Sequence, residues 1–501
     1  MTNPSPRAGR REWTAFVVLL LPLLLVSMDV SVLFFAVPAI SESLHVTGAQ
    51  QLWIFDIYAF ALSGLLITMG SLGDRIGRRK LLMFGAAAFG AASVAAAYAQ
   101  SAEMLIAARA VLGIGGATLM PSTMALVRNM FHDDKQRSAA IGIWSGAMAG
   151  GIALGSVMGG LLLEHFWWGS VFLVNVPAMV LLLILAPLLV PEFKDPAPGR
   201  FDLLSVPLSM AAVLPVTYGM KKIASDGTPS ALALGSIAAG LLVGWAFVRR
   251  QRRNPDAMIS RELFRHRLFG AGITVNTVAA FGMMGSSYFT TQYLQGVLGK
   301  GPLEAALWSI APSIAIGAAG PAATAVAQKV DKAYVIAAGF VVAALGFALL
   351  VLTDTDALWT ALIAAAVIGC GIITVMALVS DLALSTTPVE KAGTASSLME
   401  TGQEFGGALG MAVFGSIGTA VYRGEVPDAL PSGLPAGVLH AARETLGEAV
   451  GAARQLPAAA GEGVLTAARE AFTHGMHVAA LGGAVVFALA SVLAATTLRQ
   501  K

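Results

Sequence analysis

Fourteen apolar runs divide this chain, and each is long enough for a helix to cross a lipid bilayer. About 20 apolar residues are needed to span the hydrocarbon core. Hydrophobic residues make up 56% of the 501 residues and charged residues only 12%, against about 25% charged residues in soluble domains. The sequence therefore predicts an all-α polytopic membrane protein. The runs lie at about 14–37, 52–72, 81–99, 103–126, 138–161, 168–190, 202–220, 231–248, 268–296, 303–326, 333–352, 357–379, 393–420 and 475–497.

Lysine and arginine are distributed unevenly over the loops between these runs. If both termini are cytoplasmic, 24 of the 32 lysines and arginines fall in cytoplasmic segments. Membrane proteins concentrate positive charge in such loops. The sequence thus predicts 14 transmembrane helices with both termini cytoplasmic, in the bacterial cytoplasmic (inner) membrane. The most basic loop, 249–267, either links two halves of the molecule or anchors it at lipid headgroups.

A single carboxylate lies in the middle of the first run. Asp29 is the one charged residue between Phe16 and Pro38. A charge in hydrocarbon costs roughly 2.5–3.5 kcal/mol on the insertion scale, so intramembrane acids usually serve a proton, an ion or a cationic ligand. The alternative is that Asp29 lies at the membrane interface.

Three further acids, Asp56, Glu400 and Glu404, fall inside other runs. Glu400 and Glu404 are four residues apart and therefore share one helix face. Two carboxylates this close in a low-dielectric cavity do not both ionise easily, which is the property that a proton carrier needs. Each could instead be a packing element that pairs with a lysine, with Gln403 or with the backbone.

Glycines and charges are interleaved in the loop between the second and third runs. Glycine permits close helix approach and tight turns, and Asp74 can form a charge network with its basic neighbours. The loop resembles motif A of the major facilitator superfamily, which latches the cytoplasmic side closed when the carrier faces outward. A degraded copy at 327–332 indicates that the two halves are repeats. The resemblance implies a gating role for Gly70, Gly73, Asp74, Arg75, Gly77 and Arg78.

Two more segments resemble motifs of the same superfamily. Residues 109–116 are similar to motif B, with Leu112 in place of the usual glutamine. An intramembrane cation needs a partner. Because the first and fourth spans are neighbours in this fold, Asp29 is the expected partner of Arg109; backbone carbonyls or water are the alternative.

Residues 151–160 resemble motif C, which marks proton-driven exporters, although Ser156 stands where proline is expected. Serine does not impose the same kink. The small residues still allow a close approach of the neighbouring helix. This packing role is expected of Gly151, Gly155, Gly159 and Gly160.

The whole chain is similar to the fourteen-span drug:proton antiporter family. The segment 28–32, the turn at 164–168 and the long segment before the last run resemble exporters of quaternary ammonium compounds and methyl viologen. This resemblance implies two six-helix bundles with two additional helices. The expected parts are an N-terminal bundle at 1–190, the added helices at 191–250, a cytoplasmic linker at 251–267, a C-terminal bundle at 268–421 and 474–501, and an extracytoplasmic segment with a helical hairpin at 422–473.

The implied function is export of lipophilic cationic drugs, dyes and biocides, driven by protons that compete for the same carboxylates. We expect Asp29 and Glu404 to be essential for coupling, and Glu400 and Asp56 to tune the preference for cations. The energy source is the proton-motive force, with no cofactor, and the carrier is expected to work as a monomer.

A cation pocket should be aromatic and adaptable, although such side chains at helical spacing are more often ordinary packing. The candidates are Phe34, Phe55, Tyr58, Trp144, Phe281, Met283, Met284, Tyr288, Gln292 and Met399.

Other classes of function have less support in the sequence. Cys370 is the single cysteine, and the seven histidines are scattered near the ends of the runs, so neither a disulfide nor a metal cluster is expected. No Walker A sequence is present. A facilitator for a small metabolite or an organic anion would need several cations facing the cavity, and a membrane enzyme would need polar clusters in its loops. We therefore expect neither an enzyme nor a nucleic-acid partner.

Overall fold

The computed structural model describes residues 8–194, 204–226, 228–253, 267–385 and 392–499, and these residues contain helices and no β-strand. One short π-helical segment, η1, continues α11. The elements are α1 (Arg10–Leu44), α2 (Gly48–Ile76), α3 (Arg78–Ala97), α4 (Ala102–Met130), α5 (Asp134–His165), α6 (Ser170–Leu173), α7 (Asn175–Leu189), α8 (Ser205–Asp226), α9 (Ala231–Arg253), α11 (Arg267–Gln292), η1 (Tyr293–Val297), α12 (Pro302–Trp308), α13 (Ile310–Val326), α14 (Lys332–Leu350), α15 (Leu358–Ser385), α16 (Ala392–Ala429), α17 (Ala436–Glu444), α18 (Leu446–Ala453) and α19 (Ala458–Thr497).

Among the described residues, 11 helices are long and apolar enough to cross a membrane. The number becomes 12 if α2, which bends by 48° after Leu66, is counted as one span. Outside this count, α5 and α8 have 32 and 22 residues, which is also enough to span the hydrocarbon core. The predicted all-α polytopic fold is confirmed at this level. The count of fourteen spans and the cytoplasmic position of both termini stay predictions.

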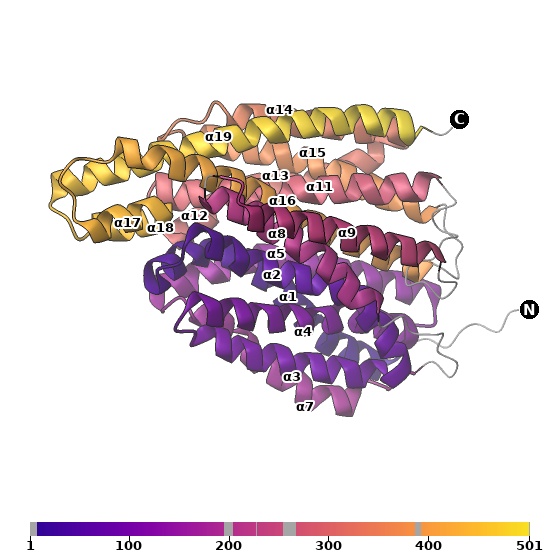
Figure 1. Cartoon of the computed structure of the whole chain (residues 1–501). Helices are drawn as coiled ribbons and strands as arrows, with labels where there is room; N and C mark the ends of the chain where they lie inside the picture. Colours follow the sequence, from indigo (N-terminus) through magenta and orange to yellow (C-terminus); the bar gives the residue numbers. More distant parts are fainter. Residues whose placement is uncertain (1–7, 195–203, 227, 254–266, 386–391, 500–501) are drawn as a thin grey trace, which may run out of the picture.

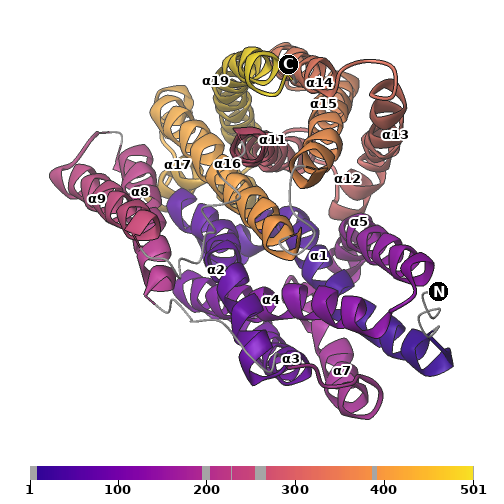
Figure 2. The same ribbon diagram turned by 90° about the vertical axis from the view of Figure 1, so that its right-hand side faces the viewer.

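The helices form two groups that face each other (Figure 2). In the N-terminal half, which comprises α1–α7, α1 packs on α5 and α4 packs between α2 and α3. In the C-terminal half, which comprises α11–α19, α11 packs on α15 and α16, and α14 packs on α15 and α19. The two halves meet where α2 contacts α16 and where α5 contacts α12. Side chains on these facing helices are therefore placed to line the interface between the halves.

The helices α8 and α9 form a separate pair at one side of the bundle (Figure 2). They pack against each other, and α8 also contacts α2 and α16. The pair thus lies beside the contact between α2 and α16, at the edge of the interface between the halves.

Two of the predicted runs are broken helices, and each break is explained by a proline. The run at 168–190 forms α6 and α7, and the run at 303–326 forms α12 and α13. Pro177 and Pro312 are each the third residue of the second helix. Proline has no N–H to donate to the carbonyl four residues earlier, so the first helix of each pair ends at that earlier residue.

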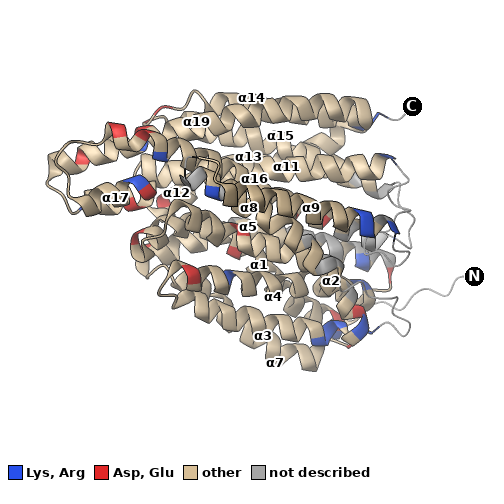
Figure 3. Cartoon of the chain, in the orientation of Figure 1, with Lys and Arg blue, Asp and Glu red and all other residues tan. Residues whose placement is uncertain are grey.

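The two ends of the bundle differ. The start of α1 and the end of α19 lie at one end, which we call the terminal end, and α17 and α18 lie at the opposite hairpin end (Figure 1). Charged residues gather towards the two ends, and the middle of the bundle is mostly uncharged (Figure 3). This distribution suits a hydrocarbon core between two aqueous surfaces.

The segment before the last span contains a helical hairpin. Here α16 continues to Ala429, and α17 and α18 form the hairpin, while the extracytoplasmic position of 422–473 stays a prediction. Residues 463–472, which have the periodicity of an amphipathic helix, belong to the beginning of α19, a single helix of 40 residues. Pro457 starts this helix, and no proline follows to interrupt it, so the amphipathic stretch continues directly into the last span.

Candidate functional site

An ion pair is buried between α1 and α4. The Arg109 guanidinium donates through Nη1 to Oδ2 of Asp29, and both side chains are 2% exposed. The Nε–H of Arg109 donates to the carbonyl of Ile54 on α2, at 3.0 Å. The predicted partner of Arg109 is therefore confirmed. Each charge is compensated by the other, which is the condition for keeping charges in a low-dielectric interior.

The ring of Tyr58 completes this cluster from α2. The Arg109 guanidinium carbon lies 4.4 Å from the centre of the ring, which is within the range of a cation–π interaction. Tyr58 is 1% exposed. Three helices thus meet around one guanidinium, and Tyr58 lies in the cluster rather than on an open pocket wall.

Glycines on α4 allow α2 to approach this cluster closely. A Cβ at Gly113 would lie 2.5 Å from the carbonyl oxygen of Tyr58 and 2.8 Å from the Cβ of Ala61. A Cβ at Gly116 would lie 3.3 Å from the Tyr58 hydroxyl. A larger residue at Gly113 would push Tyr58 away from Arg109, since its nearest neighbour there is backbone.

The glycines of the motif C segment bring α5 against α1. A Cβ at Gly151 would lie 2.8 Å from the carbonyl oxygen of Leu24, and one at Gly155 would lie 2.8 Å from the Cα of Met28. Gly159 faces Val32 in the same way, at 3.3 Å. These three positions flank Asp29 along α1, so the approach of α5 fixes the segment that carries this carboxylate.

The fourth glycine of that segment faces the other half. A Cβ at Gly160 would lie 2.7 Å from the Cα of Leu303 on α12. At the position where motif C has proline, the Ser156 hydroxyl donates to the Ile152 carbonyl at 3.2 Å, and α5 is continuous through it. The tight packing thus extends from α1 to the contact between the halves without a break in α5.

Glu400 and Glu404 lie on α16 and are half-buried. The carboxylate of Glu404 is within electrostatic range of the Tyr58 hydroxyl, and the two glutamates are within range of each other. Glu404 of the C-terminal half therefore lies near Tyr58 of the Asp29–Arg109–Tyr58 cluster, across the interface between the halves.

A row of glycines that we did not single out from the sequence positions α16. Gly402, Gly406 and Gly410 lie on one face of the helix, and a Cβ at Gly406 would lie 2.1 Å from the carbonyl oxygen of Thr277 on α11. The amide of Asn276 also donates to the carbonyl of Met399, at 3.1 Å. Their four-residue spacing is readable in the sequence and typical of close helix pairs in membranes.

Asp56 is buried on α2, 1% exposed, and lies near the partner half. It is within electrostatic range of Tyr288 on α11. The ring of Phe55 is edge-on to Tyr288 at 5.9 Å and is tilted against Phe34 at 5.1 Å. Three of the candidate pocket residues thus form a continuous aromatic path across the interface, beside Asp56.

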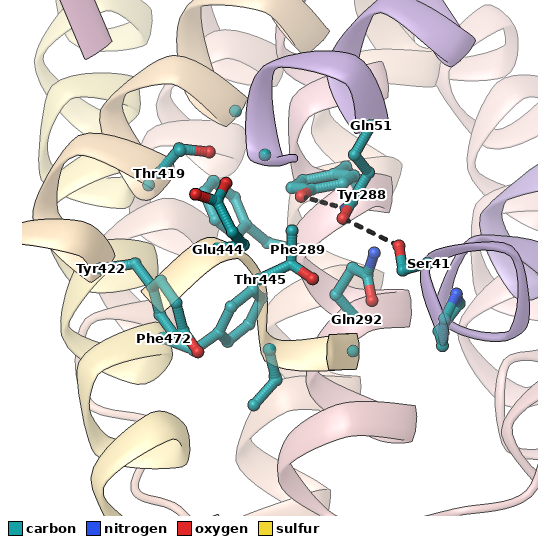
Figure 4. A pocket seen from close by; sticks show the side chains of 16 residues that line it. Ser41, Gln51, Tyr288, Phe289, Gln292, Thr419, Tyr422, Glu444, Thr445 and Phe472 are labelled. Atoms are coloured by element: carbon teal, nitrogen blue, oxygen red, sulfur yellow. Dashed lines mark hydrogen bonds between the residues drawn. The ribbon is translucent and has the colours of Figure 1, made fainter. Parts of the chain in front are cut away.

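A cavity lies between the halves near the hairpin end (Figure 4). On its wall the Gln51 amide donates to the Tyr288 hydroxyl at 2.9 Å and accepts from the Ser41 hydroxyl at 3.3 Å. Gln292, Glu444 and Phe472 also line it. Of the candidate pocket residues, Tyr288 and Gln292 line this cavity, and Gln51 is a wall residue that the sequence did not indicate.

The remaining pocket candidates lie in helix contacts. The Trp144 indole donates to the Thr123 hydroxyl at 3.3 Å, between α5 and α4. Phe281 packs on Phe414 at 5.2 Å. Met284 contacts Gly407. Met283 and Met399 join the apolar core. These contacts are the ordinary packing that methionine and aromatic side chains at helical spacing usually make.

The loop that resembles motif A is held against the end of α7. Gly77 has φ of +111°, a conformation that favours glycine. The Glu192 carboxylate accepts from the backbone N–H of Arg79 at 2.9 Å and of Lys80 at 3.2 Å, and so caps the first turn of α3. Glu192 was not indicated by the sequence.

Inside the same loop, Arg78 pairs with Asp74. Gly73 packs under the Arg78 side chain, and Gly70 faces Pro121 on α4. Arg75 lies in the last turn of α2. The loop residues are thus assembled at the junction of α2 and α3, while their gating role stays a prediction.

Known proteins similar to this chain include an efflux pump and a resistance protein. The chain is 41% identical to the multidrug efflux pump LfrA of Mycolicibacterium smegmatis, over 100% of this chain and 99% of that protein. It is 34% identical to the methyl viologen resistance protein SmvA of Salmonella typhimurium, over 92% and 93% of the two chains.

Solved structures show the same fold at low identity. A bacterial homologue of the human lysosomal transporter Spinster, inward-facing and occupied, matches with a TM-score of 0.67 and 17% identity, over 98% of both chains. The nucleoside transporter NupG matches with a TM-score of 0.60 and 12% identity, over 96% of this chain and 99% of that one. The family model of the Major Facilitator Superfamily matches residues 19–411. This chain belongs to the major facilitator superfamily.

Proposed function

We propose that this protein is a proton-coupled antiporter that exports lipophilic cationic drugs, dyes and quaternary ammonium biocides by alternating access. Its similarity to a multidrug efflux pump and to a methyl viologen resistance protein supports drug export. Methyl viologen is itself an aromatic dication. The arrangement of acids inside the bundle supports the use of protons as the driving ion.

One observation carries the proposal. Glu404 on α16 faces the Asp29–Arg109–Tyr58 cluster across the interface between the halves. Arg109 is already paired with Asp29, so its charge is compensated within the N-terminal half. Glu404 can therefore take either a proton or an organic cation, and Glu400 one turn away adds a second carboxylate.

Exchange follows from competition at these carboxylates. A proton that arrives from outside displaces the cation, and a cation that arrives from the cytoplasm displaces the proton. Because the carrier returns with one or the other bound, the proton gradient drives export without an open leak. The aromatic rings near Asp56 offer the faces on which a flat cation can stack.

Asp29 has a different role from the one its sequence position alone suggests. Since it neutralises Arg109, its removal would free a guanidinium next to Tyr58, the residue on which Glu404 acts electrostatically. A free cation there would hold Glu404 ionised and repel a cationic substrate. We therefore propose that Asp29 is essential because it keeps Arg109 occupied, and that Glu404 binds the exchanged ions.

The membrane arrangement that goes with this function is fourteen spans with both termini cytoplasmic, in the bacterial inner membrane. The 12 apolar spans that the described residues contain when the bent α2 is counted as one, together with α5 and α8, would supply them. This orientation places the hairpin end outside and the loop that resembles motif A in the cytoplasm.

The function is tested by ethidium transport in inverted membrane vesicles energised with a proton gradient. We expect accumulation that a protonophore abolishes, and Glu404→Gln should lose the gradient-driven component. Glu470→Gln is the matched control, because Glu470 is an exposed acid on α19, and it should transport like the native protein. Gradient-driven transport that survives Glu404→Gln would refute the assignment of the site.

The anion facilitator considered from the sequence has less support. It needs unpaired cations facing the cavity, and Arg109, the intramembrane cation on which it depended, is paired with Asp29. The same vesicle assay separates the two: no proton movement with any of several lipophilic cations would favour the anion carrier.

A further inference from the structure

The hairpin at the end of the bundle contains a buried carboxylate. Glu448 is the third residue of α18 and is 7% exposed, although hairpins of this kind usually place their acids in water. Burying an acid costs free energy unless it is paired or neutral. The surroundings of Glu448 therefore decide which form it takes.

Local structure does not satisfy this carboxylate. Thr445 and Glu448 have the spacing of a capping box, in which the glutamate reaches back to the backbone N–H of the cap residue. Only one of the two hydrogen bonds of this box is described: the Thr445 hydroxyl accepts from the backbone N–H of Glu448 at 3.1 Å. Among the described residues, Oε1 of Glu448 has no hydrogen-bond donor.

A histidine of the other half of the molecule lies beside Glu448. The Nδ1 atom of His45, at the C-terminal end of α1, lies 4.0 Å from Oε1 of Glu448. The His45 side chain is 83% exposed, so solvent would screen a charge on it strongly. This contact alone therefore compensates an ionised Glu448 weakly.

The other charged groups around Glu448 do not supply a free cation either. Glu444 on α17 acts on it as a second negative charge, and Arg423 on α16 pairs with Glu444. His440 is also directed at Glu444, at 3.8 Å.

Groups from the remaining neighbours are directed elsewhere. Tyr422, within electrostatic range of Glu448, donates its hydroxyl to the Ala442 carbonyl at 2.8 Å. From α19, the Arg469 side chain donates to the carbonyl of Gly296 on η1, at 3.3 Å. Arg423 thus pairs with Glu444, and the contacts described for Glu448 include no arginine.

The hairpin connects the two halves at this point. On the α1 side, a Cβ at Gly447 would lie 3.2 Å from the Cβ of Ser41, and Arg454 pairs with Glu42 at 3.3 Å. On the other side, α17 is attached to α16 through Arg423. Detachment of α18 from α1 would therefore open the hairpin end of the interface while the hairpin stays on the C-terminal half.

We propose that Glu448 is a proton-binding site, and that a proton on Glu448 holds the hairpin against α1 across the interface between the halves. In its neutral form Glu448 fits the buried position that it occupies, and ionised Glu448 favours a detached hairpin in which water solvates the carboxylate.

The direction of the pH effect follows from this geometry. Burial and then the charge of Glu444 raise the pKa of Glu448 to about 7, from an ordinary value of 4.5. The attached hairpin thus binds the proton more tightly than a detached one. The proton on Glu448 therefore stabilises the attachment of the hairpin to α1 fully below pH 4.5. This stabilisation decreases as the pH rises towards 7 and is absent above pH 7.

This inference rests on the proposed function for its physiological meaning. If the hairpin end faces outside, an acidic exterior protonates Glu448 after the cation has left. The hairpin then attaches to α1 and closes the outer end of the interface between the halves. The carrier would then return with its proton, because closure outside depends on the same ion that drives export.

The experiment measures the distance between spin labels on the hairpin and on the N-terminal half, in detergent without gradient or substrate. Cysteines replace Gly437 on α17 and Met104 on α4, in a Cys370→Ser background. A Cβ at Gly437 meets nothing within 4 Å and Met104 is 42% exposed, so both labels are tolerated. We expect a short distance at the acid end of the titration that gives way to a longer one as the pH rises, with a midpoint between pH 4.5 and about 7.

Three variants test whether Glu448 causes the pH-dependent change in the distance between the labels. Glu448→Gln should keep the short distance from pH 5 to pH 9, and Glu444→Gln should shift the midpoint to lower pH because a neighbouring negative charge is lost. Glu470→Gln should behave like the native protein. A distance that does not change with pH, or a midpoint that survives Glu448→Gln, would overturn the proposal.

The assay also separates this inference from the proposed function. It uses neither substrate nor gradient, so its outcome does not depend on whether ethidium is transported. A pH-dependent hairpin in a protein that moves no cation would refute the antiporter alone.

Discussion

At the scale of single residues, the buried Asp29–Arg109 pair decides which charges remain for transport. Both side chains are 2% exposed, and Arg109 also bonds the Ile54 carbonyl and lies on the Tyr58 ring. Every contact described for the guanidinium is made to the N-terminal half. Under the proposed function, the acids of α16 are the groups left to exchange the proton and the cation.

Replacing Asp29 by asparagine should destabilise the protein, because it leaves Arg109 buried without its counter-charge. Breaking a buried pair in this way costs about 3–5 kcal/mol. Thermal unfolding of the purified protein in detergent measures the loss, and ethidium transport in vesicles should be abolished.

The double variant Asp29→Asn with Arg109→Gln is the informative companion. Removing both charges should recover most of the thermal stability, since no uncompensated charge remains, but it should not recover native transport. An Asp29→Asn protein that unfolds at the native temperature and still transports ethidium would contradict the role given to this pair.

The residues of the site could be predicted from the sequence only where chemistry singled them out. A charge in an apolar run is conspicuous, and the resemblance to motif B placed Arg109 beside the first span, so the pair with Asp29 could be predicted. The hydrogen bond between Gln51 and Tyr288 could not be predicted. Periodicity does not indicate which uncharged side chains will meet when their helices are far apart in the sequence.

At the scale of helices, glycine spacing sets the distances between neighbours. Gly155 on α5 faces the backbone of Met28, one residue before Asp29, and Gly406 on α16 faces the backbone of Thr277, two residues after Glu404. In each half, a glycine that allows a neighbouring helix to approach closely thus positions an acidic residue. Without a strong hydrophobic effect between helices in lipid, such close approach is a main source of association.

A methyl group at Gly155 should therefore destabilise the contact between α1 and α5. Its Cβ would lie 2.2 Å from the Ser31 hydroxyl oxygen and 2.8 Å from the Cα of Met28, so the backbone must shift. Overpacking of this kind costs about 1–3 kcal/mol, which thermal unfolding of Gly155→Ala measures.

Gly150→Ala is the control on the same helix, since a Cβ at Gly150 meets nothing within 4 Å. It should be neutral or stabilising by up to about 1 kcal/mol, because alanine favours helix more than glycine does. Equal effects of the two substitutions would show that the α1–α5 approach does not depend on Gly155.

Helix positions were largely predictable, and their ends less so. The apolar runs mark most of the spans. The length of a run does not predict where a helix is interrupted, and Pro177 and Pro312 explain two such interruptions. The start of α19 was placed too late, because an amphipathic stretch and an apolar span look like separate elements in the sequence and yet form one helix when no breaker separates them.

At the scale of the whole molecule, the ionisable groups form two sites along the interface between the halves. Glu404 lies near Tyr58 of the Asp29–Arg109–Tyr58 cluster inside the bundle, and Glu448 lies where the hairpin meets α1. A change of proton occupancy at either site would act on contacts between the halves. This arrangement suits a carrier that alternates by moving one half against the other.

The central claim is that a proton and an organic cation compete for the acids of α16. The direct measurement is proton release when tetraphenylphosphonium is added to the purified protein in weakly buffered solution. We expect the native protein to release protons as the cation binds, with weaker binding at lower pH, and Glu404→Gln to release markedly fewer. Cation binding without proton release, or equal release from native and Glu404→Gln protein, would contradict the account.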